Sequence, residues 1–253
     1  MGVHEVAASG FGAGADDYER GRPSYPEDVV TWLVDRLRIG PGRRVVDLAA
    51  GTGKLTRLLV PSGAEVIAVE PVAAMRDKLA DAAPGVVALD GTAEALPFDD
   101  ATVDAVTVAQ AFHWFDAGAA LAEIARVLGP GGALGLVWND RDTREPWVAE
   151  LSRLIRWDER ERWRVPYTVE VDWGRRVAEA DAPFGPGEHL ESGYRQPMEP
   201  ETLVARVLST SYLAGLASEV REEIAGRVRS LVAPLGDHFE LPYRTYAWAF
   251  RRS

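Results

Sequence analysis

Apolar positions in the first 140 residues follow two alternating patterns. Short, nearly continuous apolar runs predict buried strands at 45–48, 65–69, 86–89, 103–109 and 133–138. Apolar residues at helical spacing predict helices at 26–37, 54–60, 72–83 and 116–128. Near-continuous apolar strands that alternate with helices are typical of a parallel sheet covered on both faces. The pattern therefore predicts an α/β fold.

The pattern changes after Asn139, where tryptophan and tyrosine are scattered among paired charges. An amphipathic stretch at 201–233 is interrupted around 212–218. Alternating aromatic and small residues predict a final strand at 243–252, and we place one more strand between 188 and 196. The rest of this part of the chain is expected to be mostly helical and to cap the sheet.

The composition limits the classes of function. The formal net charge of -11 argues against a nucleic-acid partner, which needs a concentrated basic face. The chain has no cysteine, which excludes a disulfide, a thiolate metal site and a cysteine nucleophile. No apolar run approaches the roughly 18 residues of a membrane helix, and the N-terminus lacks a basic region followed by an apolar stretch. We expect a cytoplasmic protein without a membrane partner.

A glycine turn and a carboxylate follow the first two predicted strands. Residues 45–53 read VVDLAAGTG, and Glu70 ends the next apolar run. Gly51 and Gly53 let the backbone turn tightly against a ligand, and a carboxylate at the end of the second strand suits a ribose diol. Ligands of doubly wound sheets bind outside the carboxyl ends of the strands, where Thr92 and Gln110 also fall. Together these features predict a nucleoside cofactor site.

Five segments carry a resemblance to a known family. They are VVDLAAGTGKLT at 45–56, VIAVEP at 66–71, GTAEALPF at 91–98, VDAVTVAQAFHWFD at 103–116 and EIARVLGPGGALGLVWN at 123–139. In this order and spacing the chain resembles the class I S-adenosylmethionine-dependent methyltransferases, and within them the small-molecule group that includes trans-aconitate methyltransferases. The RPSYP segment at 22–26 is also similar to the N-terminal region of that group.

The resemblance implies a fold and a division of the chain. The fold would be a Rossmann-like, doubly wound, seven-stranded sheet in the order 3-2-1-4-5-7-6, with strand 7 antiparallel and a mostly helical cap. Residues 1–140 would form an N-terminal lid and the cofactor-binding core, 141–183 a helical cap insertion, and 184–253 the final strands with a cap segment at about 200–234. The cofactor would be S-adenosylmethionine.

The resemblance also implies which residues hold that cofactor. The turn from Ala49 through Gly51 and Thr52 to Gly53 would bind its methionine portion through the backbone, and Glu70 both ribose hydroxyls. The remaining contacts would come from Pro71 and Met75 flanking the adenine, Thr92 and Ala93 at its edge, the backbone of Gln110, Ala111 and Phe112 near the sulfonium, and Tyr18 and Arg22 over the methionine carboxylate. The alternative for Arg22 is a surface residue ahead of a helix.

Two positions depart from the family pattern. Ala49 stands where the family most often has glycine, which could narrow the turn. Thr92 stands where aspartate is frequent, so the adenine amino group would meet a hydroxyl acceptor without a charge.

Methyl transfer from a sulfonium is an in-line displacement that positioning alone can accelerate, so a base is needed only when the acceptor must lose a proton. His113 is the candidate base, since imidazole titrates near neutral pH. The alternative is that His113 shapes the substrate pocket, together with Trp114, Trp138 and Tyr212, without moving a proton. No metal is expected, because the predicted strand 103–109 is followed by Gln110, Ala111 and Phe112 with no acidic ligand.

These features predict a methyltransferase that acts on a small organic molecule, as a monomer or homodimer. One alternative is a protein that binds S-adenosylmethionine without transferring its methyl group. The other is an NAD-dependent oxidoreductase, although the turn from Gly51 to Thr56 lacks the third glycine or alanine of that fingerprint.

Overall fold

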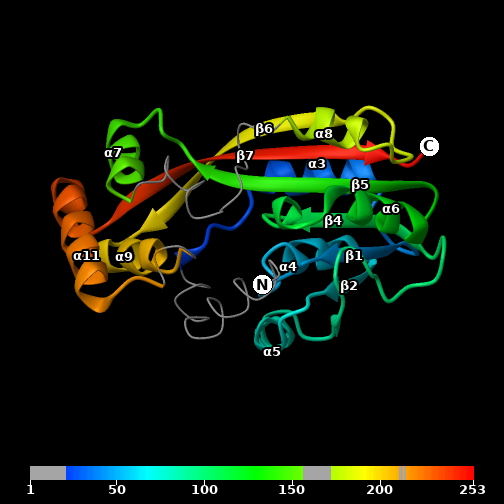
Figure 1. Cartoon of the computed structure of the whole chain (residues 1–253), viewed down its shortest axis with the longest axis horizontal. Coiled ribbons are helices and arrows are strands. Elements are labelled where there is room, and N and C mark those ends of the chain that lie inside the picture. Colours follow the sequence, from blue (N-terminus) through cyan, green and yellow to red (C-terminus); the bar gives the residue numbers. More distant parts are fainter. Residues whose placement is uncertain (1–20, 156–171, 211–212, 214) are drawn as a thin grey trace. The chain divides into compact units, whose positions relative to one another are not determined.

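The computed structural model describes residues 21–155, 172–210, 213 and 215–253 (Figure 1). It contains a seven-stranded sheet in the order β3-β2-β1-β4-β5-β7-β6, with β7 antiparallel. The strands are β1 (Arg44–Leu48), β2 (Glu65–Val69), β3 (Val87–Leu89), β4 (Val103–Ala109), β5 (Leu128–Arg141), β6 (Glu188–Met198) and β7 (Phe239–Arg251). The first five pair in parallel. The predicted fold class and strand order are confirmed.

Helices connect the strands, as the alternating pattern predicts. In the described residues they are α3 (Glu27–Leu37), α4 (Thr56–Leu59), η1 (Val60–Ser62), α5 (Ala73–Ala82), η2 (Phe112–Trp114), α6 (Ala117–Val127), α7 (Pro146–Leu154), α8 (Trp173–Glu179), α9 (Pro200–Leu208), α11 (Ser218–Val232) and η4 (Ala233–Leu235). Local chemistry sets their ends. Asp116 caps α6 by accepting a hydrogen bond from the backbone N–H of Ala119 at 3.0 Å.

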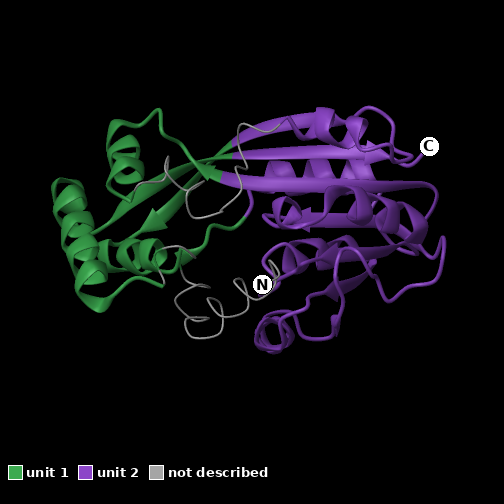
Figure 2. Cartoon of the chain, in the orientation of Figure 1, with its two compact units in different colours: residues 1–24, 140–167, 193–244 green, residues 25–139, 168–192, 245–253 purple. Residues whose placement is uncertain are grey.

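The chain divides into two compact units, which Figure 2 colours separately. The first, here called the helical unit, comprises residues 1–24, 140–167 and 193–244. The second, the sheet unit, comprises residues 25–139, 168–192 and 245–253. The segment boundaries given by the resemblance, at 140 and 183, stay a prediction.

Two apolar clusters in the sheet unit show why its strands are nearly continuous apolar runs. Val46 and Val106 pack with α6 in one cluster, and their neighbours Val45 and Ala105 pack with α3 in the other. Successive side chains of a strand point to opposite faces, so both faces of the sheet are buried.

The helical unit has an apolar cluster of its own. Its buried residues come from α7, α9, α11 and the ends of β6 and β7, and include Val148, Leu203, Val228 and Tyr243. No helix of the described residues is long and apolar enough to cross a membrane.

The start of β5 differs from the prediction, which placed Gly129 to Gly132 between a helix and a strand. The strand begins at Leu128, and its register with β4 shifts between the pairs Val103–Leu128 and Ala105–Ala133. The extra residues bulge out of the ladder. Gly131 has φ +71°, and the carbonyl of Gly132 accepts a hydrogen bond from the N–H of Arg252 at 2.9 Å. A contact with the distant end of the chain therefore keeps this glycine-rich stretch in the sheet.

Candidate functional site

The site predicted from the sequence lies at the carboxyl ends of β1, β2 and β4, within the sheet unit. Leu48 pairs with Val69 on one side and with Val108 on the other. Because the three strands are parallel neighbours, the residues that follow them emerge side by side. The glycine turn after β1, Glu70 after β2 and Gln110 after β4 are thus brought to one edge of the sheet.

The turn after β1 runs through three residues with positive φ. Ala49 has φ +53°, Gly51 +57° and Gly53 +82°. The N–H of Ala50 donates to the carbonyl of Val69, and the N–H of Gly53 donates to the carbonyl of Ala50. Among the described residues, and apart from its two chain neighbours, no atom lies within 4 Å of where a Cβ of Gly51 would stand. The backbone at Gly51 therefore borders open space, as a ligand approaching the main chain requires.

The left-handed backbone at Ala49 gives a physical reason for the glycine that the family resemblance implies at this position. An L-residue in this conformation costs roughly 1–2 kcal/mol relative to the right-handed form, whereas glycine adopts it freely. Gln110, after β4, is a second residue other than glycine in this conformation, with φ +59°. Its backbone N–H donates to Val137 at 2.9 Å and its side-chain amide donates to the carbonyl of Asn139 at 3.0 Å, which fixes the strained residue.

Glu70 is 6% exposed and is held by two backbone donors. The N–H of Gly51 donates to Oε2 and the N–H of Val72 donates to Oε1, both at 2.9 Å. These bonds fix the plane of the carboxylate and tie it to the glycine turn.

Asp47 lies under the turn and fastens it to two other elements. It is 1% exposed and accepts hydrogen bonds from the hydroxyls of Thr56, at 2.6 Å, and Thr107, at 3.0 Å. Thr56 begins α4 and Thr107 lies on β4. Burial raises the pKa of Asp47 to about 6, although the two hydroxyls lower it. The sequence does not predict this role of Asp47, because Thr107 lies 60 residues away along the chain.

The raised pKa of Asp47 predicts a pH dependence of stability. The folded chain binds this proton more tightly than the unfolded chain does, so the contribution to the free energy of unfolding is full below about pH 4 and is lost as pH rises through about 6. The resulting decrease in the free energy of unfolding reaches up to about 3 kcal/mol. In Asp47→Asn this dependence should be absent, so that between pH 4 and 7 the variant gains stability relative to the wild type in urea unfolding experiments.

Asp104 offers a control of opposite sign for that measurement. Burial raises the pKa of Asp104, but the hydrogen bonds from Arg44 and Arg43 lower it, and the net shift of the pKa is downward. Asp104→Asn should therefore lose stability relative to the wild type as pH rises. Parallel pH profiles of Asp47→Asn and the wild type would contradict the assignment of a titrating Asp47.

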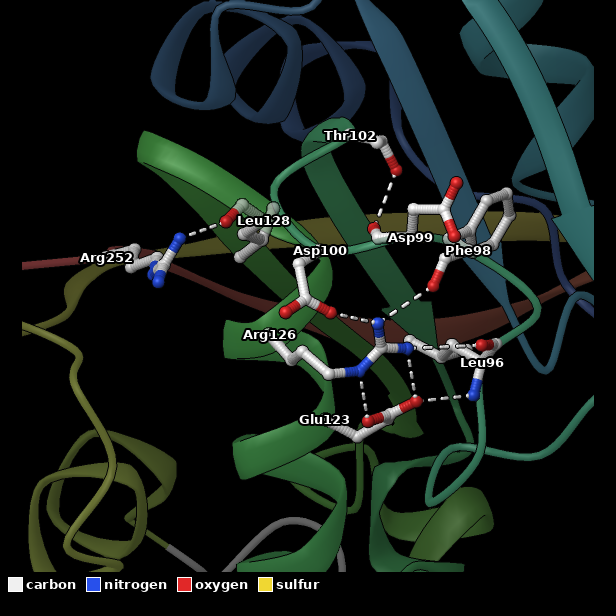
Figure 3. A network of polar contacts seen from close by, with 9 residues as sticks. All are labelled: Leu96, Phe98, Asp99, Asp100, Thr102, Glu123, Arg126, Leu128 and Arg252. Atoms are coloured by element: carbon white, nitrogen blue, oxygen red, sulfur yellow. Dashed lines mark hydrogen bonds and ion pairs between the residues drawn. The ribbon is translucent and has the colours of Figure 1, made fainter.

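A polar network holds the loop that follows β3 and carries Thr92 and Ala93 (Figure 3). Glu123 of α6 accepts from the N–H of Leu96 at 2.8 Å. Arg126 donates to the carbonyl of Phe98 at 2.8 Å and pairs with Glu123 and Asp100, each at 2.7 Å. At the start of the loop, Gly91 packs so closely that a Cβ would meet Val69 at 2.9 Å. Both ends of the loop are therefore fixed.

Removing the guanidinium should loosen this loop. We expect Arg126→Met to lower the free energy of unfolding by about 1–2 kcal/mol, since several hydrogen bonds exchange for water near the surface. If Thr92 and Ala93 meet the adenine, affinity for S-adenosylhomocysteine should also fall several-fold in calorimetry. The matched control is Arg175→Met, which removes an exposed pair with Glu179 and should change neither quantity measurably. Equal behaviour of the two variants would argue against the role of Arg126.

An aromatic group stands at the end of β4. Phe112 is 1% exposed and its ring meets Trp173 edge-on at 5.5 Å. His113 and Trp114 follow in η2 and are partly buried, with ring centroids 4.9 Å apart. Trp138 on β5 is 1% exposed and stacks on Trp173 at 4.6 Å. Trp138 is therefore an interior residue, and its predicted place in a substrate pocket stays a prediction.

The other predicted site residues have different positions. Pro71 is partly buried at the start of the segment leading to α5, and Met75 within α5 is 4% exposed. Ala93 is 2% and Ala111 9% exposed, and Thr92 is partly buried. Arg22 belongs to the helical unit. Tyr18 and Tyr212 lie outside the described residues.

Among the residues that the structure describes, no three His, Cys, Asp or Glu side chains form a cluster that could hold a metal ion. The described acids near the turn, Asp47 and Glu70, are instead engaged by hydroxyl and backbone donors. The expectation of no metal stays a prediction.

Comparison with known proteins gives concordant similarities. Residues 46–136 match a family model described as a methyltransferase domain. The chain is 44% identical to an uncharacterised methyltransferase of Mycobacterium tuberculosis, over 88% of this chain and 85% of that protein. It is 32% identical to an uncharacterised methyltransferase-like protein of Schizosaccharomyces pombe, over 98% of this chain and 97% of that protein. A solved Haemonchus contortus phospholethanolamine N-methyltransferase 2, in complex with S-adenosylhomocysteine, superposes with a TM-score of 0.61 at 14% identity, covering 100% of this chain and 60% of that one.

Proposed function

This chain belongs to the class I S-adenosylmethionine-dependent methyltransferases, and from that premise we propose that it transfers the methyl group to a small organic acceptor held beside the turn after β4. The family assignment fixes the cofactor as S-adenosylmethionine. The acceptor, its reacting atom and the residues that contact it are the proposal. The narrower likeness to trans-aconitate methyltransferases stays a prediction.

The observation that carries the proposal is the fit of the glycine turn and Glu70 to this cofactor. The open space at Gly51 gives a ligand access to the backbone, and the carboxylate of Glu70 is fixed in one plane directly beside it. We assign the ribose hydroxyls to Glu70 and the methionine portion to the backbone from Ala49 to Gly53. The adenine lies, in this assignment, against Pro71, Met75, Thr92 and Ala93.

When bound, the cofactor supplies a methyl group on a positively charged sulfur, which is already an activated leaving group. The work left to the chain is orientation. Asp47 fixes the glycine turn, the Arg126 network fixes the loop of Thr92, and the hydrogen bonds of Gln110 fix the backbone after β4. Well-oriented reactants can gain on the order of 7 kcal/mol or more from such positioning.

Arg22 and Tyr18 are proposed to close over the methionine carboxylate, because a guanidinium matches a carboxylate with two parallel donors. We also propose that the protein acts in the cytoplasm, as a monomer or homodimer, on small molecules and not on nucleic acid. The net charge of -11 supports the last point.

A screen for S-adenosylhomocysteine release tests the proposal. Purified protein is incubated with S-adenosylmethionine and panels of carboxylates, phenols and amines, and the product is measured by mass spectrometry. We expect release with at least one panel. Binding of S-adenosylhomocysteine, seen as thermal stabilisation, without turnover on any panel would favour the alternative of a protein that binds the cofactor and transfers nothing.

A further inference from the structure

Trp138 is a buried indole whose one polar atom meets His113. The ring is 1% exposed, and its N–H group donates to Nδ1 of His113 at 3.4 Å. A buried donor without an acceptor destabilises the folded protein, so the indole N–H is strongly favoured to keep its hydrogen bond. The bond is long, and the packing around Trp138 decides how firmly it is held.

Two further tryptophans fix the plane of the indole. Trp173 stacks on Trp138 with ring centroids 4.6 Å apart and planes 8° apart. Trp248 meets it edge-on at 5.6 Å and 79°. Trp138 directly follows Val137 on β5, and Val137 pairs with Ala109, the last residue of β4. The donor therefore has a fixed direction, and it points at the first turn after β4.

The short turn that carries His113 is held by backbone hydrogen bonds of its neighbours. His113 lies in η2, where the N–H of Trp114 donates to the carbonyl of Ala111 at 2.8 Å and the N–H of Phe115 to that of Phe112 at 3.1 Å. Phe112 anchors this turn through its buried ring. Both partners of the hydrogen bond are thus placed by rigid parts of the sheet unit.

The direction of the hydrogen bond sets the protonation of the imidazole. The indole nitrogen of tryptophan can only donate, so Nδ1 of His113 must present its lone pair. A neutral imidazole has one donor and one acceptor nitrogen, which leaves the proton on Nε2. A proton added at Nδ1 would set two N–H donors against each other.

We infer that Trp138 is a positioning residue that keeps the proton of His113 on Nε2, so that His113 meets the methyl acceptor as a hydrogen-bond donor and not as a base. The inference rests on the proposed function in one respect, the place of His113 beside the acceptor. It removes the general-base alternative for His113, because the only basic nitrogen of the ring is engaged by a buried donor.

Nitrogen NMR of the imidazole tests the tautomer without any enzymatic turnover. In ¹⁵N-labelled protein at alkaline pH, His113 should show a protonated Nε2 and an unprotonated Nδ1, with the signals assigned by their loss in His113→Gln. Trp138→Phe keeps a ring in the core and removes the donor, so the two tautomers should become mixed. Trp248→Phe disturbs the same aromatic group but leaves the donor, and should keep the wild-type tautomer.

Two substitutions of His113 separate a donor from a base. The glutamine amide can place an N–H near the position of Nε2, whereas the shorter asparagine cannot. We expect kcat of His113→Gln to stay within about 10-fold of the wild type, with a larger loss in His113→Asn. A general base would make both variants slower by about 10²–10⁴-fold. Affinity for S-adenosylhomocysteine should be unchanged in both.

The outcomes for the inference and for the proposed function are distinct. A wild-type proton on Nδ1, an unchanged tautomer in Trp138→Phe, or equal large losses of kcat in both His113 variants would overturn the inference. Failure to find turnover with any acceptor would count against the proposed function and leave the tautomer measurement intact. If Trp138→Phe does not fold, the wild-type spectrum alone still decides the tautomer.

Discussion

The Glu70→Gln substitution should weaken the binding of S-adenosylhomocysteine by about 100-fold, corresponding to about 3 kcal/mol. In the wild type, both oxygens of Glu70 accept backbone N–H groups, from Gly51 and Val72. The amide of Glu70→Gln must turn its NH₂ group toward one of these donors. Hydrogen bonds to a charged group contribute about 1.5–3 kcal/mol each. The weakened hydrogen bonds to the ribose hydroxyls therefore add to the repulsion between the NH₂ group and the backbone donor.

Isothermal titration calorimetry measures the effect, and Glu65→Gln is its control. Glu65 begins the same strand at the opposite end, with an exposed side chain that pairs with Arg44 at 3.0 Å. An exposed pair of this kind contributes little, so affinity and stability should stay near wild-type values. Equal affinities of the Glu70 and Glu65 variants would mean that Glu70 does not contact the ligand.

The Gly53→Ala substitution should lower the free energy of unfolding by about 4 kcal/mol. Gly53 has φ +82°, a conformation that costs an L-residue about 1–3 kcal/mol. Its added Cβ would also stand 2.9 Å from Cγ of Leu79, which is fully buried on α5. Overpacking of this kind costs about 1–3 kcal/mol.

Gly51→Ala separates folding from ligand binding at the same turn. Gly51 has a similar φ of +57°, but in the part of the chain that the structure describes only its chain neighbours lie within 4 Å of the added Cβ. We expect a loss of stability of only about 1–2 kcal/mol in urea unfolding, together with a marked loss of affinity, because the methyl group enters the space assigned to the cofactor. Comparable losses of stability in both variants would contradict the steric argument at Leu79.

The sheet and the edge that carries the candidate site were predictable because their signals are local. A buried parallel strand needs an apolar run, as at Val103 to Ala109, and the prediction gave these bounds without error. The candidate site is recognisable because a tight turn favours glycine and because a carboxylate such as Glu70 suits a diol. The sequence also predicted the two helices on either side of the interruption near residue 212, now α9 and α11.

The features that escaped prediction depend on contacts between distant residues. The bond of Thr107 to Asp47 joins β4 to β1, and the bond of Trp138 to His113 joins β5 to the turn after β4. The sequence does not give the strand register on which both contacts depend. The same is true of Gly132, which stays in β5 through a contact with Arg252. In each case the residue type is ordinary, and only its partner across the sheet gives it a role.

The order of the sheet has a consequence for synthesis of the chain. Among the strands that the structure describes, β6 has β7 as its one neighbour, and the ribosome makes β7 about forty residues later. Until then β6 carries unpaired backbone groups along its eleven residues, the kind of edge that invites association between nascent chains. Exposed and partly buried positions alternate along much of β6, and the exposed ones include glutamate and arginine. These charges oppose association between nascent chains during that interval. Completion of this sheet is therefore a late event that follows synthesis of the segment carrying α9 and α11.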